Sequence, residues 1–151
     1  MPSANRGKYA EGHVRRRLVE RAKMADFQFM RLPDAHAGSF QPTTADYLIV
    51  CRSVCHFLEV KEVSHAYRLP GGNFGQDQRA RLNAFREAGA MSWVLVCFRP
   101  KDAGMLWRMC PSTYFGTDTP PSWDMRDLPI MSLDDALALL FSQGEWNVQH
   151  R

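Results

Sequence analysis

The chain lacks long hydrophobic runs: none approaches the ~20 consecutive apolar residues that a membrane-spanning helix needs. Its first residues, Met-Pro-Ser-Ala-Asn-Arg-Gly-Lys, also lack the hydrophobic segment of a signal peptide, so we expect an intracellular protein. No internal repeat divides the 151 residues. Its length and even composition predict one domain over 1–151, with a core over about 5–110 and a C-terminal loop and helix over 111–151.

Cysteine is scarce, and its spacing matches no zinc-binding pattern. Cys51 and Cys55 are four positions apart, but no second Cys or His pair completes a set of four ligands. The five histidines show no ligand spacing either. Because intracellular thiols stay reduced, we expect the four cysteines to be unpaired and buried, with a structural zinc site as the alternative.

Net charge is small, at +3, but it is unevenly distributed. Residues 1–31 hold eight Lys or Arg against three acids, a local balance of +5. Such a concentration of positive charge indicates a polyanionic partner. The alternative is an ordinary solvated face of a helix.

Apolar periodicity predicts an α/β fold with the element order α-β-β-β-α-β-β-α and a mixed sheet. A stripe of small and aliphatic residues every four positions indicates a first helix, and a near-continuous apolar run over 91–98 indicates a central strand. The expected helices cover 6–25, 76–88 and 132–141, and the expected strands cover 27–31, 47–50, 56–60, 91–98 and 105–110. The segments 33–42, 65–75 and 111–130 are expected to be loops.

Two carboxylates lie in the expected hairpin of strands 47–50 and 56–60. A hairpin centred on its polar turn pairs residues whose numbers sum to 105, so Val50 faces Cys55 and Asp46 faces Glu59. Facing side chains have Cβ atoms roughly 4.5–5.5 Å apart, where like charges repel. A hard cation with oxygen ligands would turn this repulsion into attraction.

Lys61 follows Glu59 by two positions and therefore points to the same face of the strand. An ammonium group there could hold an attacking water or stabilise charge on a phosphate. The alternative is a surface hairpin with a Glu–Lys pair on its solvated face.

Two helical positions add polar groups to the inward side. Glu11 borders the buried stripe of the first helix, and Gln78 lies on the inward face of the helix over 76–88. Glu11 could instead pair with Arg15 one turn on, and Gln78 could act as a helix-entry hydrogen bonder.

Three short motifs resemble those of the PD-(D/E)XK nuclease superfamily, and within it the RecU-type Holliday junction resolvases and their phage-encoded relatives. These motifs are Asn5-Arg6-Gly7-Lys8 with Glu11, Ala45-Asp46 with Glu59-Val60-Lys61-Glu62, and Leu69-Pro70 and Asn73 with Gln78 and Leu82. The chain departs from that pattern at Ala45, where the superfamily has proline, and at Asp77, where RecU-type enzymes have histidine. Its short hairpin also has no counterpart of their stalk.

The resemblance implies a restriction-endonuclease-like α-β-β-β-α-β core and a Mg²⁺-dependent endonuclease that resolves four-way DNA junctions in recombination and repair, with Mn²⁺ able to substitute. It assigns catalysis to Glu11, Asp46, Glu59, Lys61 and Gln78, and metal binding to Asp46, Glu59, Glu11 and the carbonyl of Val60. We assign DNA binding to Arg6, Lys8, Arg15, Arg16 and Arg17.

The expected state is a homodimer in the cytoplasm of a bacterium or a phage-infected cell, because a four-way junction offers two symmetric strands. Residues 111–130 and the first helix are the candidate interfaces. Two alternatives remain: a restriction-like or repair nuclease acting on duplex, flap or end substrates, and a non-catalytic DNA-binding accessory module of recombination.

Overall fold

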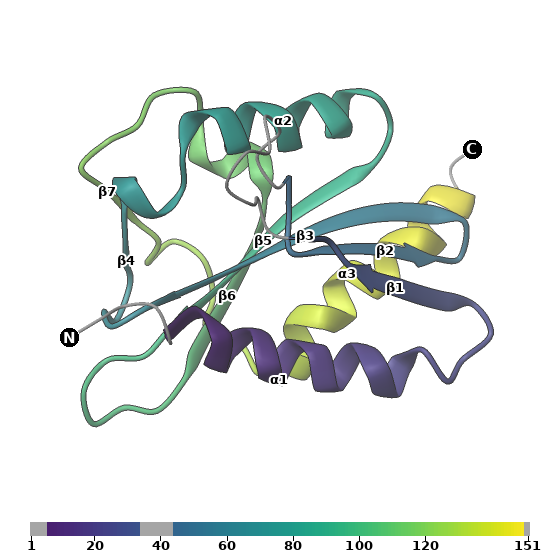
Figure 1. The fold of residues 1–151 in the computed structure, drawn as a ribbon, viewed down its shortest axis with the longest axis horizontal. Coiled ribbons are helices and arrows are strands. Elements are labelled where there is room, and N and C mark those ends of the chain that lie inside the picture. Colours follow the sequence, from purple (N-terminus) through teal and green to yellow (C-terminus); the bar gives the residue numbers. More distant parts are fainter. Residues whose placement is uncertain (1–5, 34–43, 150–151) are drawn as a thin grey trace.

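The computed structural model describes residues 6–33 and 44–149, so most of the loop expected over 33–42 lies outside the described residues. The described residues form three α-helices and seven strands, which follow one another along the chain (Figure 1). In order they are α1 (Arg6–Arg21), β1 (Phe27–Arg31), β2 (Tyr47–Cys51), β3 (Val54–Val63), β4 (Arg68–Pro70), a 3₁₀ helix (Gly71–Asn73), α2 (Gln76–Glu87), β5 (Met91–Phe98), β6 (Leu106–Pro111), a second 3₁₀ helix (Ser112–Phe115), β7 (Ser122–Asp124) and α3 (Leu133–Gln149).

The main sheet has five strands in the order β1-β2-β3-β5-β6. Its pairs are antiparallel except β3 with β5, which run parallel because α2 lies in the connection between them. This is the mixed sheet that the sequence predicts. The β2–β3 register is also confirmed: Val50 faces Cys55 across a turn in which Arg52 and Ser53 have φ values of 50° and 68°. Two positive φ values in succession match the strand twist of tight hairpins.

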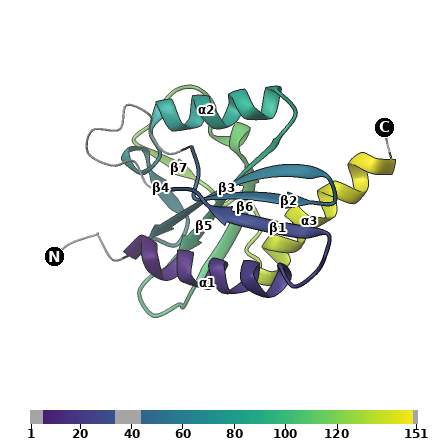
Figure 2. The same cartoon turned by 45° about the vertical axis from the view of Figure 1, so that its right-hand side comes forward.

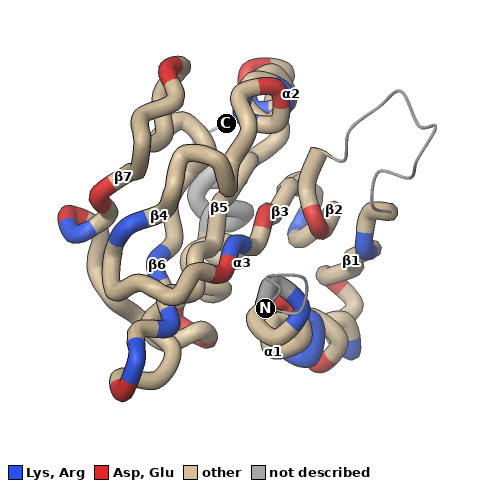
Figure 3. Tube along the Cα trace, turned by 60° about the vertical axis from the view of Figure 1, so that its left-hand side comes forward, with Lys and Arg blue, Asp and Glu red and all other residues tan. Residues whose placement is uncertain are grey.

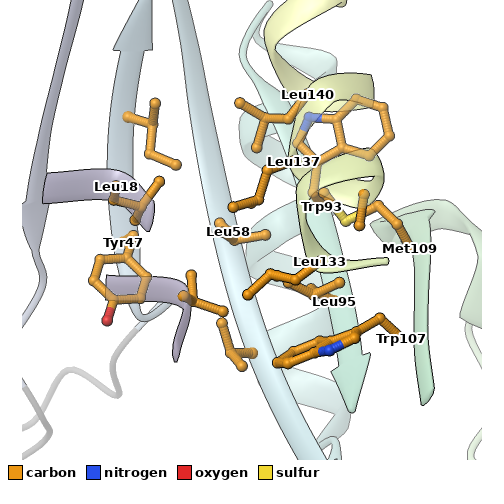
Figure 4. Close-up of a cluster of buried hydrophobic side chains, with 14 of the residues drawn as sticks. Leu18, Tyr47, Leu58, Trp93, Leu95, Trp107, Met109, Leu133, Leu137 and Leu140 are labelled. Atoms are coloured by element: carbon orange, nitrogen blue, oxygen red, sulfur yellow. The ribbon is translucent and has the colours of Figure 1, made fainter. Parts of the chain in front are cut away.

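Helices cover both faces of this sheet, with α2 on one side and α1 and α3 on the other (Figures 1 and 2). On the α1 and α3 side, the predicted stripe of Ala10, Val14, Leu18 and Ala22 packs against the sheet, with the first three side chains fully buried and Ala22 partly buried. Leucines from α3 complete this core, which Figure 4 shows in close-up. Ser132 caps the start of α3, since its Oγ accepts a hydrogen bond from the Asp135 backbone N–H at 3.0 Å.

Two predicted loops contain regular structure, which corrects the sequence interpretation. β4 in segment 65–75 pairs with β7 in segment 111–130, placing Leu69 opposite Trp123. Rings of Phe74, Phe115 and Trp123 pack edge to face beneath them, with centroids 5.0 to 6.4 Å apart. These strands have three residues each, and partners about fifty positions away leave no local pattern.

Other boundaries differ less. α1 ends at Arg21 rather than at residue 25. Helical periodicity predicts Phe85 as a core contact of α2, but it is 39% exposed, although its ring centroid lies 4.4 Å from that of Phe57. All four cysteines are free, and three are fully enclosed, as predicted: Cys51, Cys97 and Cys110. In the described part of the chain, no helix has the length and apolarity to span a bilayer.

A buried histidine in this core makes stability depend on pH. His56 is fully buried, and its Nδ1 accepts a hydrogen bond from Trp93 Nε1 at 3.1 Å. Burial lowers the pKa of His56 from 6.5 to about 4. Between these values the unfolded chain binds a proton that the native protein does not, so stability falls as the pH falls.

We expect His56 to lower the free energy of unfolding by about 2.5 kcal/mol at pH 4.5 relative to pH 7.5. Urea denaturation of the wild type and His56→Gln at both pH values measures this, since glutamine keeps an acceptor but does not titrate. The exposed His65 provides the control as His65→Gln. An equal pH dependence in the wild type and His56→Gln would contradict the prediction.

Candidate functional site

The candidate site lies where β2 and β3 part. Tyr47 is the first residue of β2 and pairs with Leu58, while β3 continues beyond this pair to Val63. Asp46 immediately precedes Tyr47, at the register position opposite Glu59, and its Oδ2 accepts a hydrogen bond from the Val60 backbone N–H at 2.7 Å. This bond fixes the aspartate against β3 at the point where pairing between the two backbones ends.

Glu59 and Lys61 point to the α2 side of the sheet and contact each other. Lys61 Nζ lies 2.8 Å from Glu59 Oε1, with 7% of the glutamate side chain and 16% of the lysine side chain exposed. The ammonium also lies 5.2 Å from the ring centroid of Phe74. Removing both charges from water is costly unless further polar groups satisfy them, so this pair needs additional partners.

Gln78 at the start of α2 supplies one such partner. Its Oε1 accepts a hydrogen bond from Lys61 Nζ at 3.4 Å, and its Nε2 donates to the Thr44 carbonyl at 3.3 Å. The amide therefore connects the lysine to the segment that leads into Asp46. The structure thus brings together four predicted site residues: Asp46, Glu59, Lys61 and Gln78.

The electrostatics of the site favour a cation. Burial, and then the charge of Glu59, raises the pKa of Asp46 from 3.8 to about 8; the more distant Glu11 adds to the rise. The Val60 N–H and the Lys61 charge oppose this shift without cancelling it. Two carboxylates that resist simultaneous ionisation are the donor set that a divalent cation stabilises.

Glu11 is close to this group but does not join it. Arg31 Nε, at the end of β1, lies 2.5 Å from Glu11 Oε1. The backbone carbonyl of Glu11 accepts a hydrogen bond from the Tyr47 hydroxyl at 3.4 Å, which ties α1 to β2. The observed salt bridge of Glu11 therefore joins it to Arg31, a contact across 20 positions, rather than to the Arg15 of the sequence-based alternative.

The protein ligands for a metal are therefore few. Within residues 6–33 and 44–149, no three His, Cys, Asp or Glu side chains gather into a metal site. Asp46 and Glu59 remain, with the carbonyl of Val60 as a third oxygen. This set suits Mg²⁺, which keeps several waters and takes one or two carboxylates together with substrate phosphates.

The residues predicted to bind DNA lie on α1, where Figure 3 shows Lys and Arg gathered in blue, but they divide between its sides. Lys8 and Arg15 line a depression of about 240 Å³ together with Glu11 and Arg31. Arg17 points elsewhere, with its Nε 2.7 Å from Asp134 of α3. Arg16 contacts His13 at 3.4 Å, and the Arg6 side chain lies outside the described residues.

Arg31 is the residue that sequence reasoning missed. The sequence analysis counted Arg31 only in the charge balance of residues 1–31, because strand alternation does not place it beside Glu11. Only the packing of α1 against the end of β1 makes it part of the depression.

No family model matches the sequence, and no curated protein matches it. Among solved structures, the fold is similar to that of Hjc, a Holliday junction resolvase from the archaeal hyperthermophile Archaeoglobus fulgidus. The two share 25% sequence identity with a TM-score of 0.51, and the match covers 78% of this chain and 88% of Hjc. The fold is therefore of the PD-(D/E)XK nuclease type, as the sequence motifs predict, with a mixed sheet between helices.

Proposed function

We propose that this protein is a metal-dependent endonuclease that hydrolyses phosphodiesters in branched DNA, and that its substrate is the four-way junction. The observation that carries the proposal is the Asp46–Glu59 carboxylate pair with Lys61 held 2.8 Å from Glu59. Its setting on a fold similar to that of a junction resolvase supports the choice of substrate.

Asp46, Glu59 and the Val60 carbonyl would hold a Mg²⁺ ion. When bound, the ion would neutralise the two carboxylates and supply positive charge against a scissile phosphate. Asp46 would have to lose its proton first, because its pKa lies near 8 in the metal-free protein. Metal affinity should therefore rise with pH through this range.

Lys61 would act on the water and the phosphate. Its ammonium can donate hydrogen bonds to the attacking water and to a phosphate oxygen, while Glu59 and Gln78 fix its position. Attack forms a bond from the water oxygen to phosphorus and breaks the bond to the departing strand. The water proton leaves to solvent, and the departing oxygen takes up a proton.

The DNA backbone would reach the carboxylates past α1. Lys8 and Arg15 line the depression that also contains Glu11, whose charge reaches Asp46. Cations at such positions contact phosphates without reading sequence, which suits a structure-selective enzyme. In this arrangement, Glu11 orients Arg31 and contributes negative charge at the border of the metal site.

The test is cleavage of a synthetic four-way junction in Mg²⁺, compared with a duplex, a flap and a blunt end of matched sequence. We expect metal-dependent cleavage that is fastest on the junction. Equal or faster cleavage of the duplex or the flap would contradict the four-way junction as substrate and would favour a repair nuclease. Binding without turnover in Mg²⁺ or Mn²⁺ would favour a non-catalytic accessory module.

A homodimer forms part of the proposal, and much of the apolar surface that suggested its two interfaces faces the interior of the chain. The apolar stripe of α1 and the side chains Phe115, Trp123 and Met125 are buried within the chain's own cores. Three apolar side chains on the α2 side of the molecule are exposed. Met30 is 54% exposed, Val50 45% and Phe85 39%.

We expect Val50→Asp to convert a dimer into monomers, because a carboxylate in the centre of an apolar interface would lose its hydration without gaining a partner. Light scattering coupled to gel filtration at micromolar concentration measures this. Leu139→Asp, on α3 and 41% exposed, is the matched control and should leave the mass unchanged. A wild-type protein that is monomeric at that concentration, or a dimer that survives Val50→Asp, would contradict this interface.

A further inference from the structure

A second depression, of about 500 Å³, lies on the other side of the start of α1. It is lined by Tyr9 of α1, Glu62 and Ser64 at the end of β3, Arg99 after β5, and the turn that leads to residue 105. Glu62 alternates with Lys61 along β3, so this depression lies one strand position from the site lysine but on the opposite face of the sheet. The site described above does not use it.

Arg99 is held rigidly in this depression. Its backbone N–H donates to the Val63 carbonyl at 2.8 Å, which anchors it beside the end of β3. Its Nη1 lies 3.1 Å from Oε1 of Glu62, whose side chain is only 2% exposed, whereas the Arg99 side chain is 41% exposed. Its guanidinium carbon also lies 4.4 Å from the ring centroid of Tyr9. A guanidinium has five N–H donors in a fixed plane, so one carboxylate contact leaves the group able to bind an anion.

Arg99 adds to a group of positive charges around His13 of α1. The charges of Arg16, Arg17 and Arg99 lower the pKa of His13, after a larger contribution from burial. His13 packs edge to face against Tyr9, with ring centroids 4.7 Å apart, and contacts Arg16. Side chains in contact therefore run from Arg99 through Tyr9 and His13 to Arg16, across the outward side of α1.

The two depressions lie on either side of the first turns of α1. Lys8 borders the first depression and Tyr9, the next residue, borders the second. A helix with its side chains is about 10–12 Å across. A DNA strand rises about 3.4 Å per nucleotide, so it crosses such a helix within a few nucleotides. A strand passing the carboxylates would therefore reach Arg99 after crossing the first turns of α1.

From this geometry we infer that the Arg99–Tyr9 depression is a second DNA subsite, which binds a backbone phosphate a few nucleotides from the cleaved bond. Arg99 donates to the phosphate oxygens, Glu62 and Tyr9 position the guanidinium, and Ser64 lies on the wall. The inference rests on the proposed function, since it assumes that DNA is the substrate. It adds a contact made away from the metal site.

Phosphate ethylation interference tests it, with a labelled four-way junction in Ca²⁺ so that binding is measured without turnover. In the wild type we expect ethylation to interfere at phosphates next to the cleaved bond and at one further phosphate a few nucleotides away. Arg99→Ala should abolish interference at that further phosphate alone, reduce affinity roughly 3- to 10-fold, and lower the slope of log affinity against log salt by about one.

Arg99→Ala removes the ion pair with the buried Glu62 side chain, so its effect on DNA binding must be separated from a loss of stability. Two further variants make this separation. Ser64→Asp puts a carboxylate into the depression and keeps the Arg99–Glu62 contact, so it should abolish interference at the same phosphate; Ser64→Asn, its neutral counterpart, should not. Arg126→Ala is the matched control. Arg126 lies 4.4 Å from the ring of Tyr67 and 2.6 Å from Asp124, a similar arrangement outside both depressions.

The outcomes separate the two proposals. A wild type that shows no interference at any phosphate overturns both the DNA substrate and the subsite. Interference at the cleaved bond that is identical in the wild type, Arg99→Ala and Ser64→Asp overturns the subsite and leaves the nuclease proposal intact. Selective loss in both variants, with Arg126→Ala unchanged, supports the subsite.

Discussion

Lys61→Met is expected to slow junction cleavage roughly 10²–10³-fold, the usual cost of removing one preorganised donor from a reacting centre. Methionine keeps the length and apolar stem of lysine but cannot donate to the water or the phosphate. Because Lys61 acts at the scissile phosphate alone, whereas Lys8 and Arg15 provide other proposed backbone contacts, affinity for the junction in Ca²⁺ should stay close to that of the wild type. Single-turnover cleavage in Mg²⁺ and anisotropy in Ca²⁺ measure the two effects separately.

Lys23→Met is the matched control, since the Lys23 side chain is 70% exposed in the turn that follows α1 and pairs with Glu20. It should cleave at the wild-type rate. Lys61→Met also leaves Glu59 buried without its ammonium partner, so a fall in stability is expected, and the assay temperature should lie well below the measured melting point. A folded Lys61→Met protein that cleaves within tenfold of the wild type would contradict the proposed mechanism.

Asp46→Asn is expected to lower the cleavage rate by about 10³-fold and, in the metal-free protein, to raise stability at alkaline pH. Loss of activity follows because the amide cannot provide the charge that a divalent cation requires. The gain in stability follows from the pKa of Asp46, which is raised to about 8 by burial and by Glu59. Asparagine keeps an oxygen for the Val60 N–H but carries no charge.

The sign of the stability change is set by proton binding. An unfolded aspartate ionises near pH 3.8, whereas native Asp46 ionises near 8, so the native state binds the extra proton between these values. The wild type therefore loses stability as the pH rises through this window, and Asp46→Asn does not. The difference should grow from pH 4 to pH 8, reach the order of several kcal/mol, and then level off.

Urea denaturation in EDTA at pH 5, 7 and 9 measures this difference. Asp26→Asn is a control of opposite sign: the Arg52 side chain lowers the pKa of Asp26, so removing that charge should destabilise the protein at neutral pH. If Asp46→Asn and the wild type have parallel stability curves over this range, Asp46 does not carry the raised pKa. In that case the electrostatic argument for a cation at this site fails.

Local patterns determined a large part of this protein. The hairpin register follows from a two-residue turn and strand alternation, so the proximity of Asp46 to Glu59, and of Glu59 to Lys61, can be predicted from the sequence alone. The apolar stripe of α1 follows from helical periodicity in the same way. The position of Gln78 on the inward side of α2 was likewise predicted, and its contact with Lys61 agrees with it.

The remaining features required the tertiary structure because their partners are distant in sequence. β4 and β7 pair across about fifty residues, Arg31 reaches Glu11 across 20, and Arg99 reaches Tyr9 across 90. Each contact depends on how α1 and the ends of the strands pack in the folded protein. A sequence periodicity of 2 or 3.6 residues does not determine this packing. The sequence by itself therefore determined which groups could bind a metal. Only the packing of α1 against the sheet decided that Glu11 pairs with an arginine, and that two arginine-containing depressions border the helix.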